Sequence, residues 1–522
     1  MTSIIQSEEE EVAPPVYLTY EDYPEEDLFL YAGIDCLVTT DLAAELMKEA
    51  TKDTPYVEFI SMPSGKIGKR TVQIPSVWDA YQETTSAALE FIIDLELNGI
   101  AYNVPLNRII DKRMVEELGV LEERIFSGIG RKVNLNSGLE LRKLLYEEEA
   151  FEVKAFTKTG EPSTDGDAVK ELAKAYPKKL WLPDLAKRND INSLRNTFVA
   201  TYHEDFVKSD GKIHPSYNLH GTGSFRISGE EPNLTQLPRP KHAYNLRTMY
   251  GEEEGTLFLA FDFSSAEVKI LGALCRDPAL LRAIEEGKDF HSVSAAAMFG
   301  VEYEVFVAVL DEPGHHLYKQ YKEWRQASKA LTFGILYGSS PNGIAFNLNI
   351  TLDKANQLIA LYFDNFPGIK TYVELTHRMA KENKYVINAF GQRKWTYGLN
   401  DVFKGTAVYN GGLRLSQNVR VQSTSSTFGL ICFTRFNEEV KRLGGKCTCT
   451  VYDSIEAQVP IHLAAQAVEL GFKILDDDPV NMFPWLTLPV GVDAELGINW
   501  GEAKHVPRGI TQEEIERMLC LN

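Results

Sequence analysis

The sequence predicts an α+β protein of several subdomains, most of it helical. Its 522 residues exceed what one hydrophobic core usually organises, so we expect two to four subdomains. Helical spacing of apolar residues recurs along most of the chain. Strand-like apolar runs are confined to two places, TLFLAFDF at residues 256–263 and CTCTVYDSIEAQV at residues 447–459.

Composition places the chain among ordinary globular proteins and limits its partners. Apolar residues make up 44%, and no stretch approaches the ~18 continuous apolar residues of a membrane span, so we expect no membrane association. Six scattered cysteines and the lack of a secretory signal favour a reducing, cytoplasmic location. Net charge is −20, and residues 1–30 hold nine acids without Lys or Arg. A nucleic-acid site must therefore be a local basic surface.

The expected elements follow in a simple order. After the first helix, a loop-rich segment extends through residue 76, and a Gly- and Pro-rich segment, GTGSFRISGEEPNLTQLPRP, precedes the first strand run. The second strand-like segment is expected to form a strand pair. Helices, with polar interruptions at 134–138 and 157–166, are expected within residues 31–50, 77–99, 105–205, 278–380 and 415–443.

Two aspartates, 191 residues apart, stand in the strand-like segments. Asp262 ends one apolar run and Asp453 lies within the other. Strands disfavour Asp, so both positions need a reason. Carboxylates on neighbouring strands can hold two Mg²⁺ ions, the arrangement used for phosphoryl transfer. Alternatively, each Asp ends a strand or caps a helix, and spacing alone leaves both interpretations open.

A stripe of four residues occupies one face of the expected helix in RQASKALTFGILYG. Arg325, Lys329, Phe333 and Tyr337 recur every four positions. The two cations can hold the phosphates of a nucleotide, and the two rings can lie against its base or sugar. The alternative is an amphipathic helix with its aromatics in a core and its cations in water.

These motifs, taken together, resemble those of the family A DNA polymerases, the group of bacterial DNA polymerase I and many phage replicative enzymes. DFSSAEVKILGAL and VYDSIEAQVP are similar to the two palm motifs of that family, and RQASKALTFGILYG is similar to its fingers-helix motif. The resemblance extends from about residue 89 to 500. Four further segments resemble family sequence in the same order: NLNSGLELRKLL with TKTGEPST, TGSFRISGEEPNLTQLPR, EEGKDFHSVSAAAMFG and LPVGVDAELGINW.

The resemblance implies a right-hand polymerase, with an antiparallel palm sheet and mainly helical thumb and fingers. Residues 1–78 would hold the acidic N-terminus and a remnant of a 3′–5′ exonuclease-like domain. The other implied subdomains are the thumb (79–213), the first part of the palm (214–277), the fingers (278–412) and the second part of the palm (413–522).

The resemblance also assigns the catalytic residues. Asp262 and Asp453 would be catalytic ligands of two Mg²⁺ ions. Arg325, Lys329 and His291 would contact the triphosphate of an incoming deoxynucleotide. Lys329 would also be catalytic, as a proton donor to the pyrophosphate leaving group.

Further positions concern the base pair and the sugar. By resemblance, Phe333 and Tyr337 flank the nascent pair, and Glu267 crowds the sugar 2′ position and excludes ribonucleotides. Phe at position 333 implies poor use of chain-terminating dideoxynucleotides. A further group of residues is implied to contact the bases of the DNA.

Four positions are implied contacts to primer–template DNA. Arg226, Asn418 and Gln422 match minor-groove contacts, where donors test pair shape without reading sequence. Tyr452 stands where the family usually has His and can still donate a hydrogen bond toward the primer end. Ser454 stands where the family has Glu and supplies no carboxylate. Basic residues expected to line a duplex channel are Lys241, Arg247, Arg393, Lys394 and Arg420.

The segment YAGID resembles the last motif of the family's proofreading exonuclease. Tyr31 and Asp35 would share a helix face, but only about thirty residues precede them. We therefore expect no exonuclease activity from this chain. Two explanations stay open: a separate exonuclease polypeptide completes the remnant, which we favour, or the segment is a structural vestige.

The sequence thus predicts a template-directed DNA polymerase acting in replication, in a bacterial cytoplasm and of phage type. Its rivals are a single-subunit RNA polymerase, a non-catalytic DNA-binding replisome scaffold and a two-metal nuclease. Glu267 argues against the RNA polymerase, whereas Ser454 and the acidic N-terminus favour the scaffold.

Overall fold

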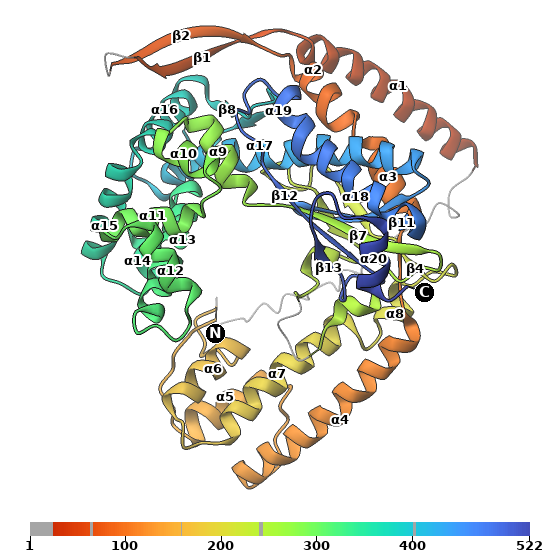
Figure 1. Ribbon diagram of the computed structural model, residues 1–522, viewed down its shortest axis with the longest axis vertical. Helices are drawn as coiled ribbons and strands as arrows, with labels where there is room; N and C mark the ends of the chain where they lie inside the picture. The colour runs from red at the N-terminus through yellow and green to blue at the C-terminus, as the bar shows by residue number, and fades with distance from the viewer. Residues whose placement is uncertain (1–24, 63–65, 158, 240–243, 400–402, 522) are drawn as a thin grey trace, which may run out of the picture.

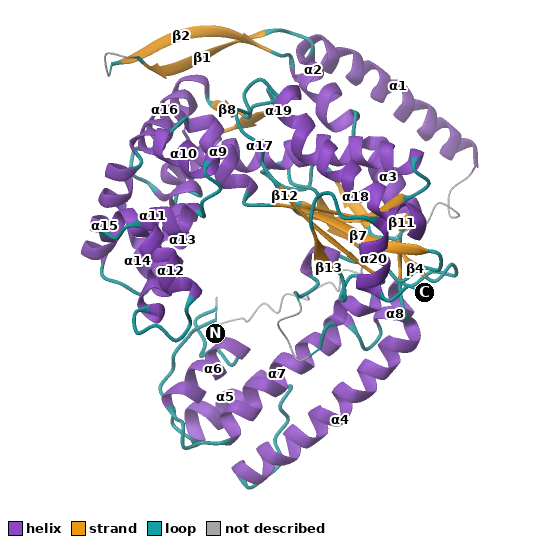
Figure 2. Ribbon diagram, viewed as in Figure 1, coloured by secondary structure: helices purple, strands orange, loops and turns teal. Residues whose placement is uncertain are grey.

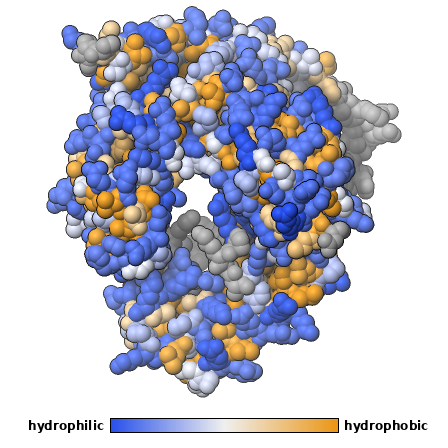
Figure 3. Space-filling model, in the orientation of Figure 1, coloured by the Kyte–Doolittle hydropathy of each residue, from blue (hydrophilic) through white to orange (hydrophobic). Residues whose placement is uncertain are grey.

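The computed structural model describes residues 25–62, 66–157, 159–239, 244–399 and 403–521, and leaves the side chains of residues 25–33 and 35 undescribed. Figure 1 shows the chain arranged around a central opening, with the fingers helices on one side, the palm sheet on the other and the thumb helices below. The space-filling view in Figure 3 shows the same opening between these three masses. The α+β class expected from the sequence, mostly helical with antiparallel sheets, is confirmed, and the expected names thumb, palm and fingers are kept for the three parts.

The palm is built on a five-stranded antiparallel sheet. Figure 2 shows its strands, in orange, beside the central opening. Both strand-like runs of the sequence lie in it, and they pair directly with each other. The strand order is β10-β11-β7-β12-β13. The strands are β7 (Thr256–Phe263), β10 (Lys446–Val451), β11 (Ser454–Pro460), β12 (Val492–Gly497) and β13 (Lys504–Val506).

Alternation along β7 separates the hydrophobic core from the opposite face of the sheet. Phe261 and Phe263 pack with the main core, where Phe261 meets Phe436 and Phe472 edge to face. Gly471 permits this approach, because an added Cβ there would lie 2.0 Å from the Phe261 ring. The helices of the palm are α9 (Ala266–Cys275), α17 (Ala407–Arg442), α18 (Ala464–Phe472), α19 (Asp478–Met482) and α20 (Gln512–Leu519).

The fingers are helical, as expected, and end in a short hairpin. In the described part of the chain no single helix is long and apolar enough to cross a membrane; only the pair α11 and α12, bent by 116°, has the combined length and composition. The elements are α10 (Pro278–Glu285), α11 (Phe290–Phe299), α12 (Tyr303–Asp311), α13 (Tyr318–Leu336), α14 (Pro341–Leu348), α15 (Leu352–Asn365), α16 (Pro367–Asn383), β8 (Tyr385–Ile387) and β9 (Arg393–Trp395).

The thumb is a helical arm with its own small core around Leu144, Val169 and Leu182. Its two long helices are tied together by ion pairs, among them Arg188 with Glu122 at 2.8 Å and Arg195 with Asp111 at 2.7 Å. The elements are β3 (Ile100–Ala101), α4 (Val104–Ile129), α5 (Gly138–Arg142), α6 (Gly166–Ala175), α7 (Trp181–Phe198), α8 (Tyr202–Phe206) and β4 (Lys212–Ile213), followed by the β5 (Ser216–Asn218) and β6 (Ser228–Glu230) hairpin.

Two expectations near the N-terminus are wrong. The segment expected to be a loop after α1 (Glu25–Ala50) forms an antiparallel hairpin, β1 (Thr54–Ser61) and β2 (Ile67–Ile74). Asn383 fixes this hairpin, because its side chain bonds both the N–H and the C=O of Val57 at 2.9 Å. The helix expected over residues 77–99 is interrupted by a π-helical turn, Gln82–Ser86, between α2 (Val77–Tyr81) and α3 (Leu89–Asn98).

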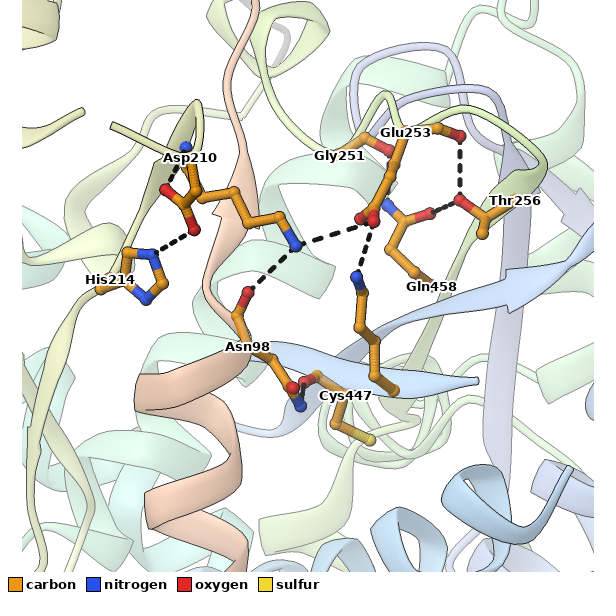
Figure 4. Close-up of polar contacts among 10 residues, drawn as sticks. Asn98, Asp210, His214, Gly251, Glu253, Thr256, Cys447 and Gln458 are labelled. Atoms are coloured by element: carbon orange, nitrogen blue, oxygen red, sulfur yellow. Dashed lines mark hydrogen bonds and ion pairs between the residues drawn. The ribbon is translucent and has the colours of Figure 1, made fainter. Parts of the chain in front are cut away.

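The thumb joins the palm through a cluster of charges around Glu253 (Figure 4). The short strands β3 and β4, where the chain enters and leaves the thumb, pair with each other. Glu253 accepts from Lys446 of β10 at 2.6 Å and lies 3.6 Å from Lys212 of β4. Beside them, His214 and Asp210 are 3.1 Å apart. One carboxylate thus holds two lysines from different subdomains together.

Removing this charge should loosen the thumb–palm junction. We predict that Glu253→Gln lowers the free energy of unfolding by about 1–2 kcal/mol, because two partly buried lysines then lose the carboxylate that pairs with both of them. The urea midpoint measures this change. Glu45→Gln, which breaks an exposed pair with Lys48 on α1, is the control and should leave the midpoint unchanged. Equal midpoints for both variants would contradict the prediction.

Candidate active site

The pairing of two strands brings the aspartates together. Ser454 lies opposite Asp262 in the β7–β11 register, so Asp453 stands in the turn at the end of the same strand pair. The Phe263 N–H donates to the Asp453 carbonyl at 3.0 Å, which ties the turn to β7. Asp262 therefore lies within a strand and Asp453 next to one. Asp262 caps no helix, since the N-cap of α9 is Ser265 and makes no side-chain cap bond.

The turn between β10 and β11 has a strained residue. Tyr452 has φ +59°, in the left-handed region that residues other than Gly rarely adopt. The residue is 58% exposed, and the centroid of its ring lies 5.8 Å from the Arg226 guanidinium. Asp453 is exposed as well, so the turn presents both side chains at the surface rather than burying either of them.

Burial and charge repulsion dominate the electrostatics of this site. Burial, then the Asp453 charge, raises the pKa of Asp262 to about 7, and Asp493 adds to the effect. Asp493 lies directly opposite Asp262 on β12, and Glu495 lies one row further along that strand. These carboxylates line one cavity of about 480 Å³, together with Arg239, Arg247 and His505. A cation bound at Asp262 and Asp453 would reduce the repulsion between their charges.

The donor set fits Mg²⁺. No group of three or more His, Cys, Asp or Glu side chains in the described residues forms a complete metal site. Mg²⁺ keeps several waters and is usually held by one or two carboxylates plus substrate phosphates, so two carboxylates suffice. Carboxylates supply the hard oxygen ligands that Mg²⁺ prefers, and a bound cation would offset the repulsion between Asp262 and Asp453 that raises the pKa of Asp262.

A second cavity, of about 230 Å³, lies against the fingers helix. Its lining includes Glu267, Phe333, Tyr337, Asp453 and Arg226. Glu267 accepts a hydrogen bond from the Tyr337 hydroxyl at 2.6 Å and an ion pair from Arg226. Asp453 borders both cavities, so the aspartate pair adjoins the pocket that the aromatic residues form.

The stripe expected on the fingers helix is present on α13. The Phe333 and Tyr337 ring centroids are 5.8 Å apart, and the Lys329 amino group lies 6.0 Å from the Phe333 ring. The opposite face of the helix, including Leu331 and Ile335, is buried in the main core. Arg325 is oriented by Asp289, whose carboxylate accepts its Nε at 2.8 Å.

His291 lies deeper than the stripe. It is 5% exposed, its ring centroid is 5.6 Å from that of Phe333, and burial lowers its pKa to about 4. The imidazole is therefore neutral at pH 7. It lines a third cavity, of about 250 Å³, with Lys269 and Lys288. The expected contact between His291 and a triphosphate stays a prediction.

The expected minor-groove residues form one hydrogen-bonded group. With its amide oriented to satisfy both atoms, Gln422 accepts from Arg226 at 2.9 Å and donates to Asn418 at 3.2 Å. Asn418 and Gln422 lie on α17, and Arg226 precedes β6. The group adjoins Glu267 through Arg226, so the pocket residues and the expected DNA contacts are linked.

Two of the residues expected to line a duplex channel make hydrogen bonds within the fold. Arg420 donates to the Ile387 carbonyl at 3.2 Å and to Thr376 at 2.9 Å, and Arg393 donates to Thr54 at 2.9 Å and to the Pro75 carbonyl at 2.8 Å. Both side chains therefore have a structural role, and their expected contact with a duplex stays a prediction. Lys241 lies outside the described residues.

Residues missed from the sequence lie beside those that were found. Asp289 begins α11 and holds Arg325, and its position in KDFHS before a helix was the available signal. Asp493 and Glu495 alternate in DAE, a pattern that places both on one face of a strand. Glu456 is 1% exposed and accepts a hydrogen bond from the Ser454 hydroxyl at 2.5 Å. Residue spacing alone does not predict that this glutamate is buried beside the site.

Comparison with known proteins identifies the family. The model of DNA polymerase family A matches residues 106–502, most of the chain, so the chain belongs to DNA polymerase family A. Relatives include DNA polymerase I of Chloroflexus aurantiacus, 26% identical over 94% of this chain, and the thermostable DNA polymerase I of Thermus filiformis, 29% identical over 81%. The chain covers 48% of each relative, about half of its length.

A solved structure shares the fold. The polymerase domain of Pol1 from M. smegmatis, in complex with DNA primer-template and dNTP, superposes with a TM-score of 0.70 and 25% identity over 80% of this chain and 70% of that one. The relatives named here are bacterial, so the expected phage origin stays a prediction. The YAGID segment lies in α1, but the side chains of Tyr31 and Asp35 lie outside the described residues.

The raised pKa of Asp262 predicts a pH-dependent penalty. Its folded pKa of about 7 exceeds the ordinary value of 3.8, so the folded state binds the extra proton and stability falls as pH rises from about 4 to 7. Without divalent cations, Asp262→Asn should therefore be more stable than the wild type at pH 8 by about 1–2 kcal/mol, and equal to it at pH 4. Thermal melts at both pH values measure this difference.

The control is Asp167→Asn, since that side chain is 95% exposed and its substitution should change neither melt. A stabilisation by Asp262→Asn of the same size at pH 4 and pH 8 would contradict the electrostatic origin. Magnesium should raise the melting temperature of the wild type at pH 8 but not that of Asp262→Asn.

Proposed function

We propose that this chain is a template-directed DNA polymerase that adds deoxynucleotides to a primer 3′-hydroxyl. One observation supports this most directly: Asp262 and Asp453 meet at the end of one strand pair, and Asp453 borders the cavity lined by Glu267, Phe333 and Tyr337. The similar M. smegmatis domain was solved with primer-template DNA and dNTP, and we infer the same substrates here.

Asp262 and Asp453 would hold two Mg²⁺ ions, which when bound activate the primer hydroxyl and stabilise the leaving oxygen. The task of the protein is to hold both carboxylates in position. The β7–β11 register fixes Asp262, and the Phe263 N–H fixes the Asp453 backbone. Asp262 is thus held by the sheet, and Asp453 by a turn that is tied to the sheet.

The α13 stripe would orient the nucleotide. Lys329 is exposed and, among the described residues, has no acidic side chain within 4 Å, so its ammonium is available to a triphosphate and to the departing pyrophosphate. Arg325 is already aimed by Asp289. Phe333 and Tyr337 offer the faces against which base and sugar would lie.

Glu267 would set sugar specificity. Its carboxylate is fixed from two sides, by the Tyr337 hydroxyl at 2.6 Å and by Arg226. A side chain held in this way has little freedom to move away from a 2′-hydroxyl. This favours deoxynucleotides and disfavours the single-subunit RNA polymerase.

Loss of either aspartate should abolish extension. We predict that Asp262→Ala and Asp453→Ala each reduce Mg²⁺-dependent extension of a labelled primer by about a thousandfold or more, while duplex binding persists. Asp167→Ala, in the exposed thumb position, is the matched control and should extend normally. Circular dichroism confirms that each variant is folded.

Other outcomes of the same assay separate the rivals. Duplex binding without extension by the wild type would support a scaffold. Shortening of the primer without added nucleotides, lost in the aspartate variants, would support a nuclease. Shortening retained in those variants would contradict the prediction that the chain has no exonuclease activity of its own.

Truncating Glu267 should relax sugar selection. We predict that Glu267→Ala raises the kcat/KM for ribonucleotides relative to deoxynucleotides by about tenfold or more, because the 2′-hydroxyl gains room. Glu267→Gln keeps the bulk of the side chain and should retain most of the discrimination. An unchanged ratio in Glu267→Ala would show that another group excludes the 2′-hydroxyl.

A role in replication and in a bacterial cytoplasm, and a separate exonuclease polypeptide, are further proposals. The apolar side chains along α1 support a docking role, because Ile34, Leu37, Val38, Leu42 and Leu46 are each more than half exposed. These residues recur at helical spacing and form one stripe. A purified exonuclease polypeptide that binds the wild type but not Leu42→Asp would support the proposal.

A further inference from the structure

The turn that presents Asp453 is short and strained. Val451 and Ser454 are register partners, so only Tyr452 and Asp453 lie between β10 and β11. Two-residue hairpin turns usually have Gly, Asn or Asp where the backbone is left-handed, because these residues adopt a positive φ at little cost. This turn has Tyr452 there, with φ +59°. Its conformation, and with it the position of Asp453, therefore needs support from contacts outside the turn.

Ser454 supplies part of this support through its side chain. Its hydroxyl lies 3.1 Å from the carbonyl oxygen of Val451, at the other end of the turn, and donates a hydrogen bond to the Glu456 carboxyl at 2.5 Å. Thr450 adds a second bond across the strand pair, from its hydroxyl to the Ser454 carbonyl at 2.7 Å. Through Ser454, a side chain deeper in the sheet can therefore act on the turn.

Glu456 is that deeper side chain. It is 1% exposed and lies opposite Cys449 of β10, whose thiol donates to it at 3.5 Å. Among the described residues its carboxyl takes part in no ion pair. Burial raises its pKa to about 8, so the carboxyl is mostly neutral at pH 7. Burying a carboxyl that has no cationic partner costs folding free energy, which indicates that its hydrogen bond to Ser454 serves the site.

We propose that Glu456 is a positioning residue for the polymerase reaction: through its hydrogen bond to Ser454 it holds the β10–β11 turn, and with it the Asp453 carboxylate, in place beside Asp262. Glu456 lines the same cavity as the two aspartates. In this role it supplies a hydrogen-bonded support for the turn and not a charge. The inference rests on the proposed polymerase function and adds to it a residue that acts through another side chain.

Single-nucleotide extension of a primer tests this role. We expect Ser454→Ala and Glu456→Ala each to lower kcat about tenfold or more, because a displaced Asp453 misaligns the reacting groups, and to change the KM for the deoxynucleotide by less than about twofold. Glu456→Gln keeps the size and the neutral hydrogen-bonding groups of the side chain and should stay within about threefold of the wild type. The double variant Ser454→Ala/Glu456→Ala should be no slower than the slower single variant, since both substitutions remove the same hydrogen bond.

Thermal melts give a second readout that does not depend on turnover. Magnesium should raise the melting temperature of Glu456→Gln at pH 8 as it does that of the wild type, whereas Ser454→Ala should need about threefold more Mg²⁺ for the same rise. Ser76→Ala is the matched control, because it breaks the bond of another buried serine, 1% exposed, to the Asp79 carboxylate at 2.7 Å at the start of α2. It should lower the melting temperature but leave kcat and the Mg²⁺ dependence unchanged.

Three results would overturn the proposal. An unchanged kcat in folded Ser454→Ala would show that the hydroxyl does not hold the turn, and losses that multiply in the double variant would show that the two residues act independently. A loss in Glu456→Gln as large as that in Glu456→Ala would show that the site uses the charge of Glu456 and not its hydrogen bond. If Glu456→Ala does not fold, Ser454→Ala and Glu456→Gln decide alone. Failure of the polymerase proposal is distinct, because the wild type then does not extend the primer.

Discussion

The pairing of β7 with β11 is the constraint on which the candidate site depends. It joins two segments almost two hundred residues apart and sets Ser454 opposite Asp262. A slip of one residue would turn every side chain of β7 to the other face. Phe261 and Phe263 prevent this slip, because both pack into the main core beneath the sheet. The hydrophobic core thus determines which face presents the carboxylates.

Much of this arrangement was predictable from the sequence, because the relevant patterns are local. Each pattern can be recognised from residues close together in the sequence. These patterns are the apolar run ending at Asp262, the strand pair around Asp453 and the four-residue spacing on α13. The β1–β2 hairpin was not predictable, since it is fixed by Asn383, 326 residues from its partner Val57. Its Gly- and Pro-containing sequence alone is typical of a loop.

The side-chain partners in the site could not be predicted from the sequence either, because they too are distant along the chain. Glu267 was identified, but its hydrogen bond to Tyr337 and its ion pair with Arg226 join three separate segments. Arg420 and Arg393 were expected to line a duplex channel, and their hydrogen bonds to distant backbone carbonyls could not be foreseen from the sequence. A basic residue in the sequence does not reveal whether its partner is a phosphate or a carbonyl.

Ser454 illustrates how the structure changes the meaning of a sequence departure. The position lacks the carboxylate that the family motif implies, but Glu456 lies two residues further on the same strand face and accepts the Ser454 hydroxyl at 2.5 Å. Burial raises the pKa of Glu456 to about 8, so it is mostly protonated at neutral pH. The pair therefore contributes hydrogen bonds and little charge. The negative charge of the site therefore comes from Asp262, Asp453 and their β12 neighbours Asp493 and Glu495 rather than from Glu456.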